Sequence, residues 1–134
     1  GVPLIRAGRP HTQLPFDVHL MVTNPAGYVP QLRELGASLV SFQLDVYWAF
    51  HAGVDPVQYV QQHGKRISML HLKDSGGAPQ HAMRAVGSGV INFPRLLAEA
   101  QLAGVAHAFV EHDNPSDAFT SIQDSYRYLT QLTK

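Results

Sequence analysis

Apolar residues follow two different spacings along this chain, and the switches between them outline the expected elements. Segments of strand-like composition alternate with segments in which apolar residues recur every three or four positions, which is the period of a helix. Strands that alternate with helices predict right-handed βαβ units and a parallel sheet, so the expected fold class is α/β with four parallel βα units. The expected strands are residues 15–22, 38–48, 66–74 and 107–113, and the expected helices are residues 2–9, 24–36, 55–64, 92–104 and 114–132.

The expected helix boundaries carry residues that satisfy free backbone groups. Asn24, Asp55 and Asn92 are the expected N-caps, and a proline follows the first two at the first helical position. Gly36 and Gly64 are expected to end the helices that begin at the first two caps. These signals support the helical segments independently of their apolar spacing.

The segment SLVSFQLDVYWAF, residues 38–50, has the composition of a strand but about twice the usual length of roughly 5–6 residues. Asp45 lies in its middle. Two explanations follow: either two strand segments are joined here, or a functional residue interrupts one strand.

Composition narrows the class of protein. The 134 residues have the size of one domain, residues 1–134. Ten basic residues balance ten acidic ones, and the longest basic run is GKR at residues 64–66, so we expect no nucleic-acid partner. The absence of cysteine excludes disulfides and thiolate chemistry. No apolar run reaches the ~20 residues that span a bilayer, so we expect no membrane partner and a cytoplasmic protein.

Polar residues gather toward the ends of the expected strands, where α/β folds place their ligand sites. Side chains alternate between the two faces of a strand, so residues two apart, such as His71 and Lys73, share a face. Carboxylate and imidazole groups on adjacent strand ends can converge on a divalent cation. The candidates are Asp45, His71, Lys73, Glu111 and Asp113, with His19 on the first strand.

Each candidate also has a structural interpretation, which the sequence leaves open. Asp45 is either a site residue or a buried carboxylate bonded to loop amides. His19 is either a ligand or a satisfied histidine of the core or rim. His71 and Lys73 are either site residues or a solvent-facing strand end, and the acidic pair of the last strand either joins the site or caps the following helix. The other six histidines follow no ligand spacing and are taken as surface groups.

The glycine-rich segment SGGAPQHAMRAVGSG, residues 75–89, follows the third expected strand. Consecutive glycines let backbone N–H groups converge, which would suit a phosphate. The segment fits no strict motif, so a flexible connector is the expected interpretation and a phosphate cradle is the alternative.

Different parts of the chain resemble two different protein families. Residues 1–42, with the run DVHLMV, resemble ribulose-phosphate 3-epimerase, most clearly over residues 14–42. Residues 43–134, with HLKD, VGSGV and VEHDNP, resemble the last part of the xylose-isomerase-like sugar phosphate isomerase/epimerase barrels. Both families are (β/α)8 TIM barrels, so the resemblance implies half of such a barrel in one chain. The seam is expected near Phe42, inside the long segment.

The resemblances imply a metal-dependent chemistry. The implied cofactor is Mn²⁺, Zn²⁺ or Mg²⁺, the implied ligand is a small sugar or sugar phosphate, and the implied reaction is proton transfer next to a carbonyl. Lys73 and Asp74 of the HLKD motif match catalytic positions near the substrate. The implied metal ligands are Asp45, His71 and Glu111, with His19 from the epimerase side.

Both resemblances are incomplete. Strands that carry other metal and phosphate motifs of the two families have no counterpart here, and Ser88 stands where the isomerase-like family usually has an acidic residue. We therefore expect an engineered or recombined half-barrel scaffold without physiological catalysis, or a natural relic of gene fusion. Open sheet edges predict self-association as a homodimer that closes an eight-stranded barrel. The alternative is a metal-dependent sugar or sugar-phosphate isomerase/epimerase.

Overall fold

The computed structural model describes residues 2–16, 18, 27–37 and 42–132 of the chain. They fall into two compact units, Gly1–Val40 and Ser41–Lys134, and each unit is described by itself. The boundary between the units lies next to Phe42, where the two resemblances are expected to meet. The expectation of one domain over residues 1–134 stays a prediction.

The described residues of the first unit form two short α-helices and a 3-10 turn. α1 is Val2–Gly8, it is followed by a 3-10 turn, η1, at Arg9–His11, and α2 is Val29–Glu34. The expected helix over residues 2–9 is therefore confirmed, and Pro10 lies in the turn that follows it.

α2 starts later than the sequence predicts. Its expected cap, Asn24, lies outside the described residues, and the helix begins only at Val29. Gly36 follows its end with a φ of +79°, a conformation that glycine adopts without steric cost. Arg9 contacts the same turn, since its Nη1 donates to the Gly36 carbonyl oxygen at 3.3 Å. The expected glycine stop is thus confirmed.

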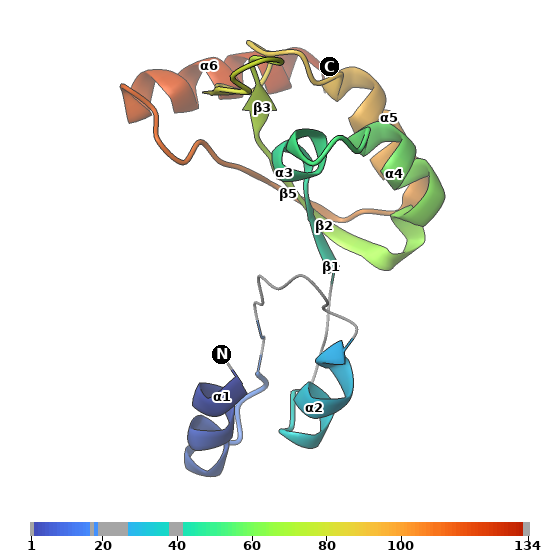
Figure 1. The fold of residues 1–134 in the computed structure, drawn as a ribbon, viewed down its shortest axis with the longest axis vertical. Coiled ribbons are helices and arrows are strands. Elements are labelled where there is room, and N and C mark those ends of the chain that lie inside the picture. Colours follow the sequence, from blue (N-terminus) through green and yellow to red (C-terminus); the bar gives the residue numbers. More distant parts are fainter. Residues whose placement is uncertain (1, 17, 19–26, 38–41, 133–134) are drawn as a thin grey trace. The chain divides into compact units, whose positions relative to one another are not determined.

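Three of the expected strands pair in the second unit (Figure 1). β1 is Phe42–Asp45, β2 is Ile67–Leu72 and β5 is His107–Val110, and among the described residues they form a parallel sheet in the order β1-β2-β5. The α/β arrangement with parallel strands is therefore confirmed. The fourth expected strand, residues 15–22, lies mostly outside the described residues, and those of its residues that are described belong to no strand.

The caps of two helices in the second unit follow the sequence signals. α4 is Pro56–His63 and α5 is Phe93–Ala103. The Asp55 side chain accepts two backbone N–H groups in the first turn of α4, the nearer at 2.8 Å, and Asn92 accepts one in α5 at 3.1 Å. Both predicted N-caps are confirmed because capping depends only on neighbours in the sequence.

α4 ends at Gly64 as expected, but this glycine does not have the left-handed conformation of a usual glycine stop. Gly64 has a φ of −54° and continues into a 3-10 turn, η3, at Gly64–Arg66. A Cβ atom on Gly64 would lie 2.5 Å from the Cβ of Ala103. Glycine is therefore required here by the close approach of α5 rather than by a left-handed backbone.

The last helix, α6, is Ala118–Leu132 and begins later than the predicted start at Asn114. Asp117 precedes it, and its Oδ1 accepts the N–H of Thr120 at 2.8 Å. The N-cap of α6 is therefore Asp117, and not Asn114 of the Asn-Pro signal.

The long apolar segment, residues 38–50, is not one strand, and that prediction is wrong. β1 ends at Asp45, and a helix, α3, follows at once over Val46–His51. Asp45 is its N-cap, because its Oδ1 accepts the backbone N–H of Trp48 at 3.1 Å. A short apolar run has the same composition in a strand and in a buried helix, so β1 and α3 together look like one long strand in the sequence. Residues 38–41 lie outside the described part of the chain.

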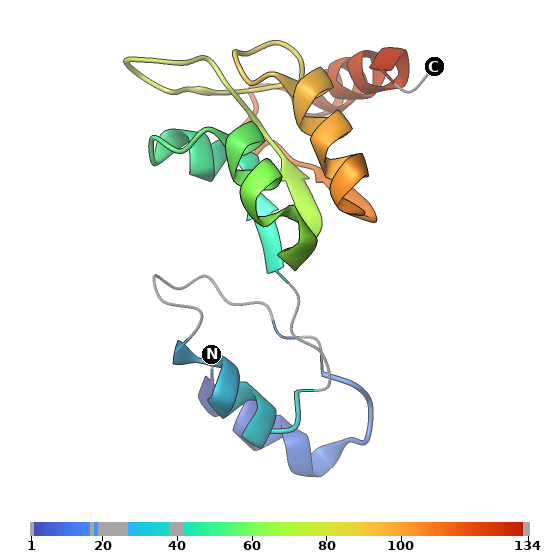
Figure 2. The same ribbon diagram turned by 90° about the vertical axis from the view of Figure 1, so that its right-hand side faces the viewer.

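The core of the second unit lies between the sheet and the helices. α4 and α5 pack against each other, and the views in Figures 1 and 2 place them over the same side of the sheet. Leu70 and Leu72 of β2 are almost fully buried in this core, so the residues that alternate with them face the other side. The buried cluster comprises Val46, Val57, Val60, Ile67, Leu70, Leu72, Val86, Ile91, Phe93, Leu96 and Ala100.

The glycine-rich segment after β2 has a defined structure. β3, Asp74–Ser75, pairs antiparallel with β4, Met83–Arg84. The Asp74 carboxylate is fully buried at 0% exposure and accepts four backbone N–H groups at 2.8–3.1 Å. The segment is therefore an anion cradle, but the anion in it is Asp74. The four donors belong to Ser75, Gly87, Gly89 and Ile91.

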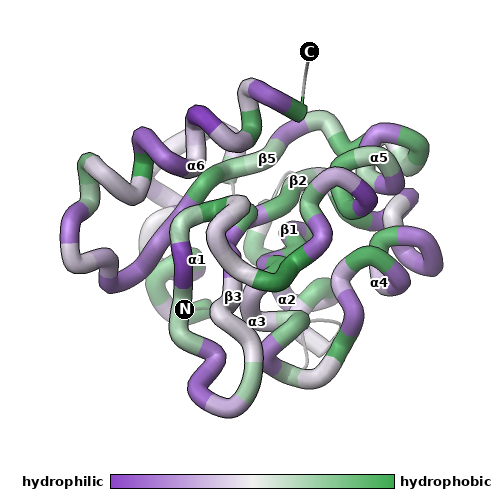
Figure 3. The backbone as a smooth tube through the Cα atoms, turned by 90° about the horizontal axis from the view of Figure 1, so that it is seen from above, coloured by the Kyte–Doolittle hydropathy of each residue, from purple (hydrophilic) through white to green (hydrophobic). Residues whose placement is uncertain are grey.

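α6 buries small polar residues and exposes apolar ones. Ser121 and Ser125 are buried, and the Ser125 hydroxyl accepts the N–H of Val86 at 3.0 Å. Figure 3 shows apolar and polar positions alternating along this helix. No helix of the described segments is long and apolar enough to cross a membrane. The exposed large apolar residues of α6 are Phe119, Ile122, Tyr126 and, at its end, Leu132.

Candidate metal centre

The register of the sheet brings polar side chains from three strands to one face. β1 and β2 pair Asp45 with His71, and the N–H of Glu111, just after β5, donates to the Leu72 carbonyl oxygen at 3.1 Å. Leu72 is buried in the core, so His71 and Lys73 on either side of it face away from the core. The carboxyl ends of the strands therefore carry a polar cluster, as the sequence predicts.

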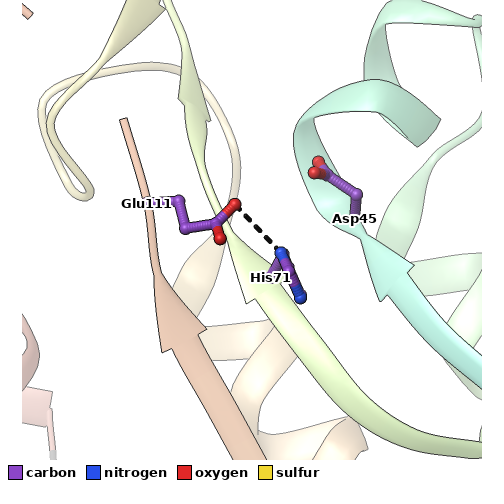
Figure 4. A group of neighbouring side chains, drawn as sticks. All are labelled: Asp45, His71 and Glu111. Carbon is purple, nitrogen blue, oxygen red and sulfur yellow. Dashed lines mark hydrogen bonds and ion pairs between the residues drawn. The ribbon is translucent and has the colours of Figure 1, made fainter. Parts of the chain in front are cut away.

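His71 lies at the centre of this cluster. Its Nδ1 is 3.0 Å from Oε2 of Glu111, and its Nε2 is 2.8 Å from Oε1 of Gln43. A carboxylate only accepts hydrogen bonds, so the pair with Glu111 requires a hydrogen on Nδ1; with a single ring hydrogen, the pair with Gln43 requires its amide to turn so that the NH₂ group donates to Nε2. Figure 4 shows His71 and Glu111 turned toward one another, with Asp45 at the end of the neighbouring strand.

Lys73 is held by three carboxylates. Its Nζ lies 3.2 Å from Oδ2 of Asp45, 2.9 Å from Oε2 of Glu111 and 2.8 Å from Oδ1 of Asp113. The Lys73 side chain is only 7% exposed, whereas the Glu111 and Asp113 side chains are 40% and 41% exposed. The ammonium group thus lies beneath a partly open rim of negative charge.

The ion pairs shift two pKa values in opposite directions. Burial alone would lower the pKa of Lys73, but the hydrogen bonds to Asp113 and Glu111 and the charge of Asp45 outweigh it and raise that pKa above its usual value. The hydrogen bond from Lys73 lowers the pKa of Glu111, and His71 acts in the same direction. Both groups are therefore held in their charged forms at neutral pH.

Three members of the cluster have the composition of a divalent-metal site. Asp45, His71 and Glu111 each offer one ligand atom, and these atoms lie within 4.8 Å of one another. Ligands at about 2.0–2.2 Å from a tetrahedral Zn²⁺ ion lie roughly 3.3–3.6 Å apart, so the side chains would have to move closer together by about 1 Å to close the site. Two carboxylates and one imidazole fit Zn²⁺ or Mn²⁺ better than they fit a soft metal.

Of the two remaining predicted site residues, only Asp74 belongs to the described part of the chain. His19 is outside the described residues, so its place relative to the cluster stays a prediction. Asp74 follows Lys73 directly but belongs to the loop, where backbone amides surround its carboxylate. Its contacts are those of a loop anchor, and a catalytic role for Asp74 stays a prediction.

One partner of the cluster, Gln43, was not foreseen from the sequence, whereas Asp113 was a predicted candidate. Gln43 orients His71, and Asp113 binds Lys73. Each lies two residues from a predicted ligand, Asp45 or Glu111, so the alternation of a strand was a usable signal.

The histidines taken as surface groups include one that is partly enclosed. Nδ1 of His81 is buried and has no hydrogen-bond partner among the described residues. The hydroxyl of Tyr47 donates to the His81 carbonyl oxygen at 2.6 Å, and the rings of His51 and His81 lie 5.3 Å apart. Residues so far apart in the chain share no spacing pattern, and only the fold brings them together.

The fold and the polar strand ends place the chain among relatives of TIM-barrel proteins. A xylose isomerase domain protein from Planctomyces limnophilus aligns with a TM-score of 0.65 at 14% identity, over 98% of this chain and 52% of that one, which is a likeness of fold alone. A sugar phosphate isomerase/epimerase from Parabacteroides distasonis aligns with a TM-score of 0.55 at 32% identity, over 75% of this chain and 36% of that one.

The sequence comparison identifies the family. The Ribulose-phosphate 3 epimerase family matches residues 1–78, and the chain belongs to this family. The cytoplasmic isoform of ribulose-phosphate 3-epimerase from Oryza sativa subsp. japonica is 48% identical over 46 residues, which are 34% of this chain and 20% of that protein. These alignments span between 20% and 52% of the related proteins. The two-part resemblance expected from the sequence is confirmed.

Proposed function

We propose that this chain is a half-barrel module for metal-assisted isomerisation or epimerisation of a sugar phosphate, with Asp45, His71 and Glu111 as the metal ligands. The observation that carries the proposal is the convergence of these three ligand atoms to within 4.8 Å at the carboxyl ends of parallel strands. Ligand sites of parallel α/β folds lie at this end of the sheet.

The reaction class follows from the groups in the cluster. A divalent ion would supply an electrophile that polarises the substrate carbonyl. The carboxylates of the cluster are the groups that can accept a proton from the adjacent carbon. Lys73 places a positive charge beside them, where it stabilises negative charge that develops on oxygen. The names of the family and of the Parabacteroides distasonis protein support a sugar phosphate as the substrate class.

The glycine-rich segment does not supply the phosphate site through its cradle. The N–H groups of Gly87, Gly89 and Ile91 already donate to Asp74. Because a carboxylate fills this position, a phosphate group of the substrate would need donors outside the cradle.

A complete active site requires more strands than this sheet contains. In the described part of the chain, β5 is an edge strand of a three-stranded sheet, and all four of its residues are exposed. Exposed edge strands pair readily with other chains. We therefore propose four βα units per chain and a homodimer in which two copies contribute to one barrel.

Sedimentation equilibrium tests the dimer. The expected result is a mass of twice 14.7 kDa at micromolar concentration. A stable species of 14.7 kDa under those conditions would contradict the dimer and leave the metal site open to solvent.

Calorimetry and proton exchange test the metal-dependent chemistry. We expect the metal-free chain to bind Zn²⁺ or Mn²⁺ and, once loaded, to exchange the proton next to the carbonyl of ribulose phosphate for deuterium in D₂O. H71Q should abolish both properties. H107Q is the matched control, because His107 is an exposed histidine of β5 outside the cluster. Metal binding or exchange that survives H71Q would contradict the assignment.

A scaffold without turnover is the second candidate. Two observations favour it: the alignments span at most 52% of the related proteins, and Lys73 already neutralises two of the proposed ligands. In this case the chain, an engineered or recombined product of two barrel segments, would bind metal without catalysing proton exchange. The same NMR experiment in D₂O separates the two candidates.

A further inference from the structure

The ammonium group of Lys73 lies where a bound cation would be needed. Its Nζ is 3.2 Å from Oδ2 of Asp45 and 2.9 Å from Oε2 of Glu111, which are two of the three proposed ligand residues. The side chain is 7% exposed and is therefore held inside the cluster rather than at its rim. The Lys73 side chain, from the residue that follows β2, thus already provides a positive charge inside the cluster.

The same oxygen atom serves two donors. Oε2 of Glu111 is 3.0 Å from Nδ1 of His71 and 2.9 Å from Nζ of Lys73. A metal ion would need this carboxylate at about 2.0–2.2 Å and the lone pair of a histidine nitrogen. Two cations that share carboxylates at such distances repel each other strongly, because little water separates them.

We propose that Lys73 is an internal competitor of the metal ion: its ammonium group occupies the cation site, and a divalent ion binds only when Lys73 withdraws from Asp45 and Glu111. This inference rests on the proposed metal site. It assigns Lys73 to the control of metal affinity, a role beyond that of a helper near the substrate.

Asp113 provides a place for the withdrawn ammonium group. Its Oδ1 makes the shortest contact with Nζ of Lys73, at 2.8 Å, and Asp113 does not belong to the proposed ligand set. The Asp113 side chain is 41% exposed, so it lies toward the open side of the cluster. Lys73 can therefore give up two carboxylates and still keep one ion pair.

Metal affinity measured by calorimetry tests the proposal. We expect K73M to bind Zn²⁺ at least about tenfold more tightly than the unaltered chain, because the competing charge is gone. K65M is the matched control: Lys65 is exposed in η3, so its substitution removes the same charge from the protein without touching the cluster. Equal or weaker binding by K73M would overturn the proposal.

The outcomes distinguish this inference from the proposed function. If the unaltered chain binds no metal and K73M does, the result supports the proposal that Lys73 competes with the metal and contradicts the proposed metal-dependent activity of the unaltered chain. If both bind equally well, the competition fails and the metal site stands. If neither binds, both proposals fail.

A measurement on the unaltered chain avoids dependence on the folding of K73M. With lysine side chains labelled with ¹⁵N, the resonance of the buried Lys73 ammonium group should shift when Zn²⁺ saturates the site seen by calorimetry. The Lys65 resonance should stay in place. Saturation with Zn²⁺ that leaves the Lys73 resonance unmoved would overturn the proposal.

Discussion

Nδ1 of His71 lies 3.0 Å from Oε2 of Glu111, although 40 positions separate the two residues in the chain. β2 and β5 pair in parallel, with Leu72 opposite Val110, so their carboxyl ends lie side by side. Because parallel strands end at the same edge of a sheet, residues from distant parts of the chain can meet there without a special loop. The candidate metal centre follows from this pairing.

D45N should separate the two roles of Asp45. Asparagine caps helices about as well as aspartate, and Lys73 keeps its ion pairs with Glu111 and Asp113, so we expect the lost ion pair with Asp45 to lower the free energy of unfolding by about 1 kcal/mol. Asparagine lacks the charge of a metal ligand, so Zn²⁺ affinity should fall at least about tenfold. Chemical unfolding and calorimetry measure the two effects. D55N is the control, because Asp55 is also an N-cap but lies outside the cluster; a similar loss of affinity in D55N would contradict the ligand role.

D74N should destabilise the second unit severely. The buried carboxylate accepts four backbone N–H groups, whereas an amide would turn its own NH₂ group toward some of them. Hydrogen bonds to a buried charge are worth about 1.5–3 kcal/mol each, so we expect a loss of about 3 kcal/mol or more. Urea unfolding measures it. D117N, at the exposed cap of α6, should cost less than about 0.5 kcal/mol; equal effects in the two variants would show that the cradle does not stabilise the fold.

G89A should be far more damaging than G104A. A Cβ atom at Gly89 would lie 2.2 Å from the Ser75 carbonyl oxygen and 2.4 Å from Oδ1 of Asp74, so the loop would have to open. At Gly104 nothing lies within 4 Å, and only the φ of +80° is unfavourable for alanine. We expect about 1 kcal/mol for G104A and more than about 3 kcal/mol for G89A in thermal or urea unfolding. A tolerated G89A would contradict the tight cradle around Asp74.

Stability should depend on acid through Glu111. Its folded pKa lies below the usual value of 4.5, so its contribution is complete above pH 4.5 and is lost as the pH falls through the lower folded value. E111Q removes the titrating group, so we expect a shallower loss of stability in acid. Urea midpoints measured over the acid range check this. E34Q, which changes an exposed residue at the end of α2, should keep the slope of the unaltered chain.

The contribution of Lys73 to stability depends on pH in the opposite direction: it is lost at high pH. Its folded pKa lies above the usual 10.5, so its contribution is complete below pH 10.5 and declines only as the pH rises further. Between these two limits neither group changes its charge, and their joint contribution should be constant. An ion-pair contribution that already declines between pH 7 and 9 would contradict this assignment.

Local signals in the sequence predicted local structure well. Asp55 and Asn92 cap their helices as expected, because a cap needs only the N–H groups of the next few residues. Exceptions were the later starts of α2 and α6 and the segment around Asp45, where an apolar strand is followed directly by an apolar helix. The composition of that segment favoured a continued strand, and no cap was predicted at Asp45.

The sequence predicted most residues of the candidate site but not the contacts between them. Strand alternation placed His71 with Lys73 and Glu111 with Asp113 on shared faces. The order of the strands, β1-β2-β5, was needed to make neighbours of these faces. The loop after β2 shows the same limit, since the expected interpretation was a flexible connector, the alternative was a phosphate cradle, and neither identified Asp74 as the anion.

From its amino acids alone this chain can be assigned its alternating strands and helices, its capped helix starts and its two-part family resemblance, since each depends on residues close together in the sequence. The folded arrangement was required to show that Lys73 lies among Asp45, Glu111 and Asp113. Ion pairs form between side chains within a few ångströms of each other, and such distances between remote residues are set by the packing of the sheet.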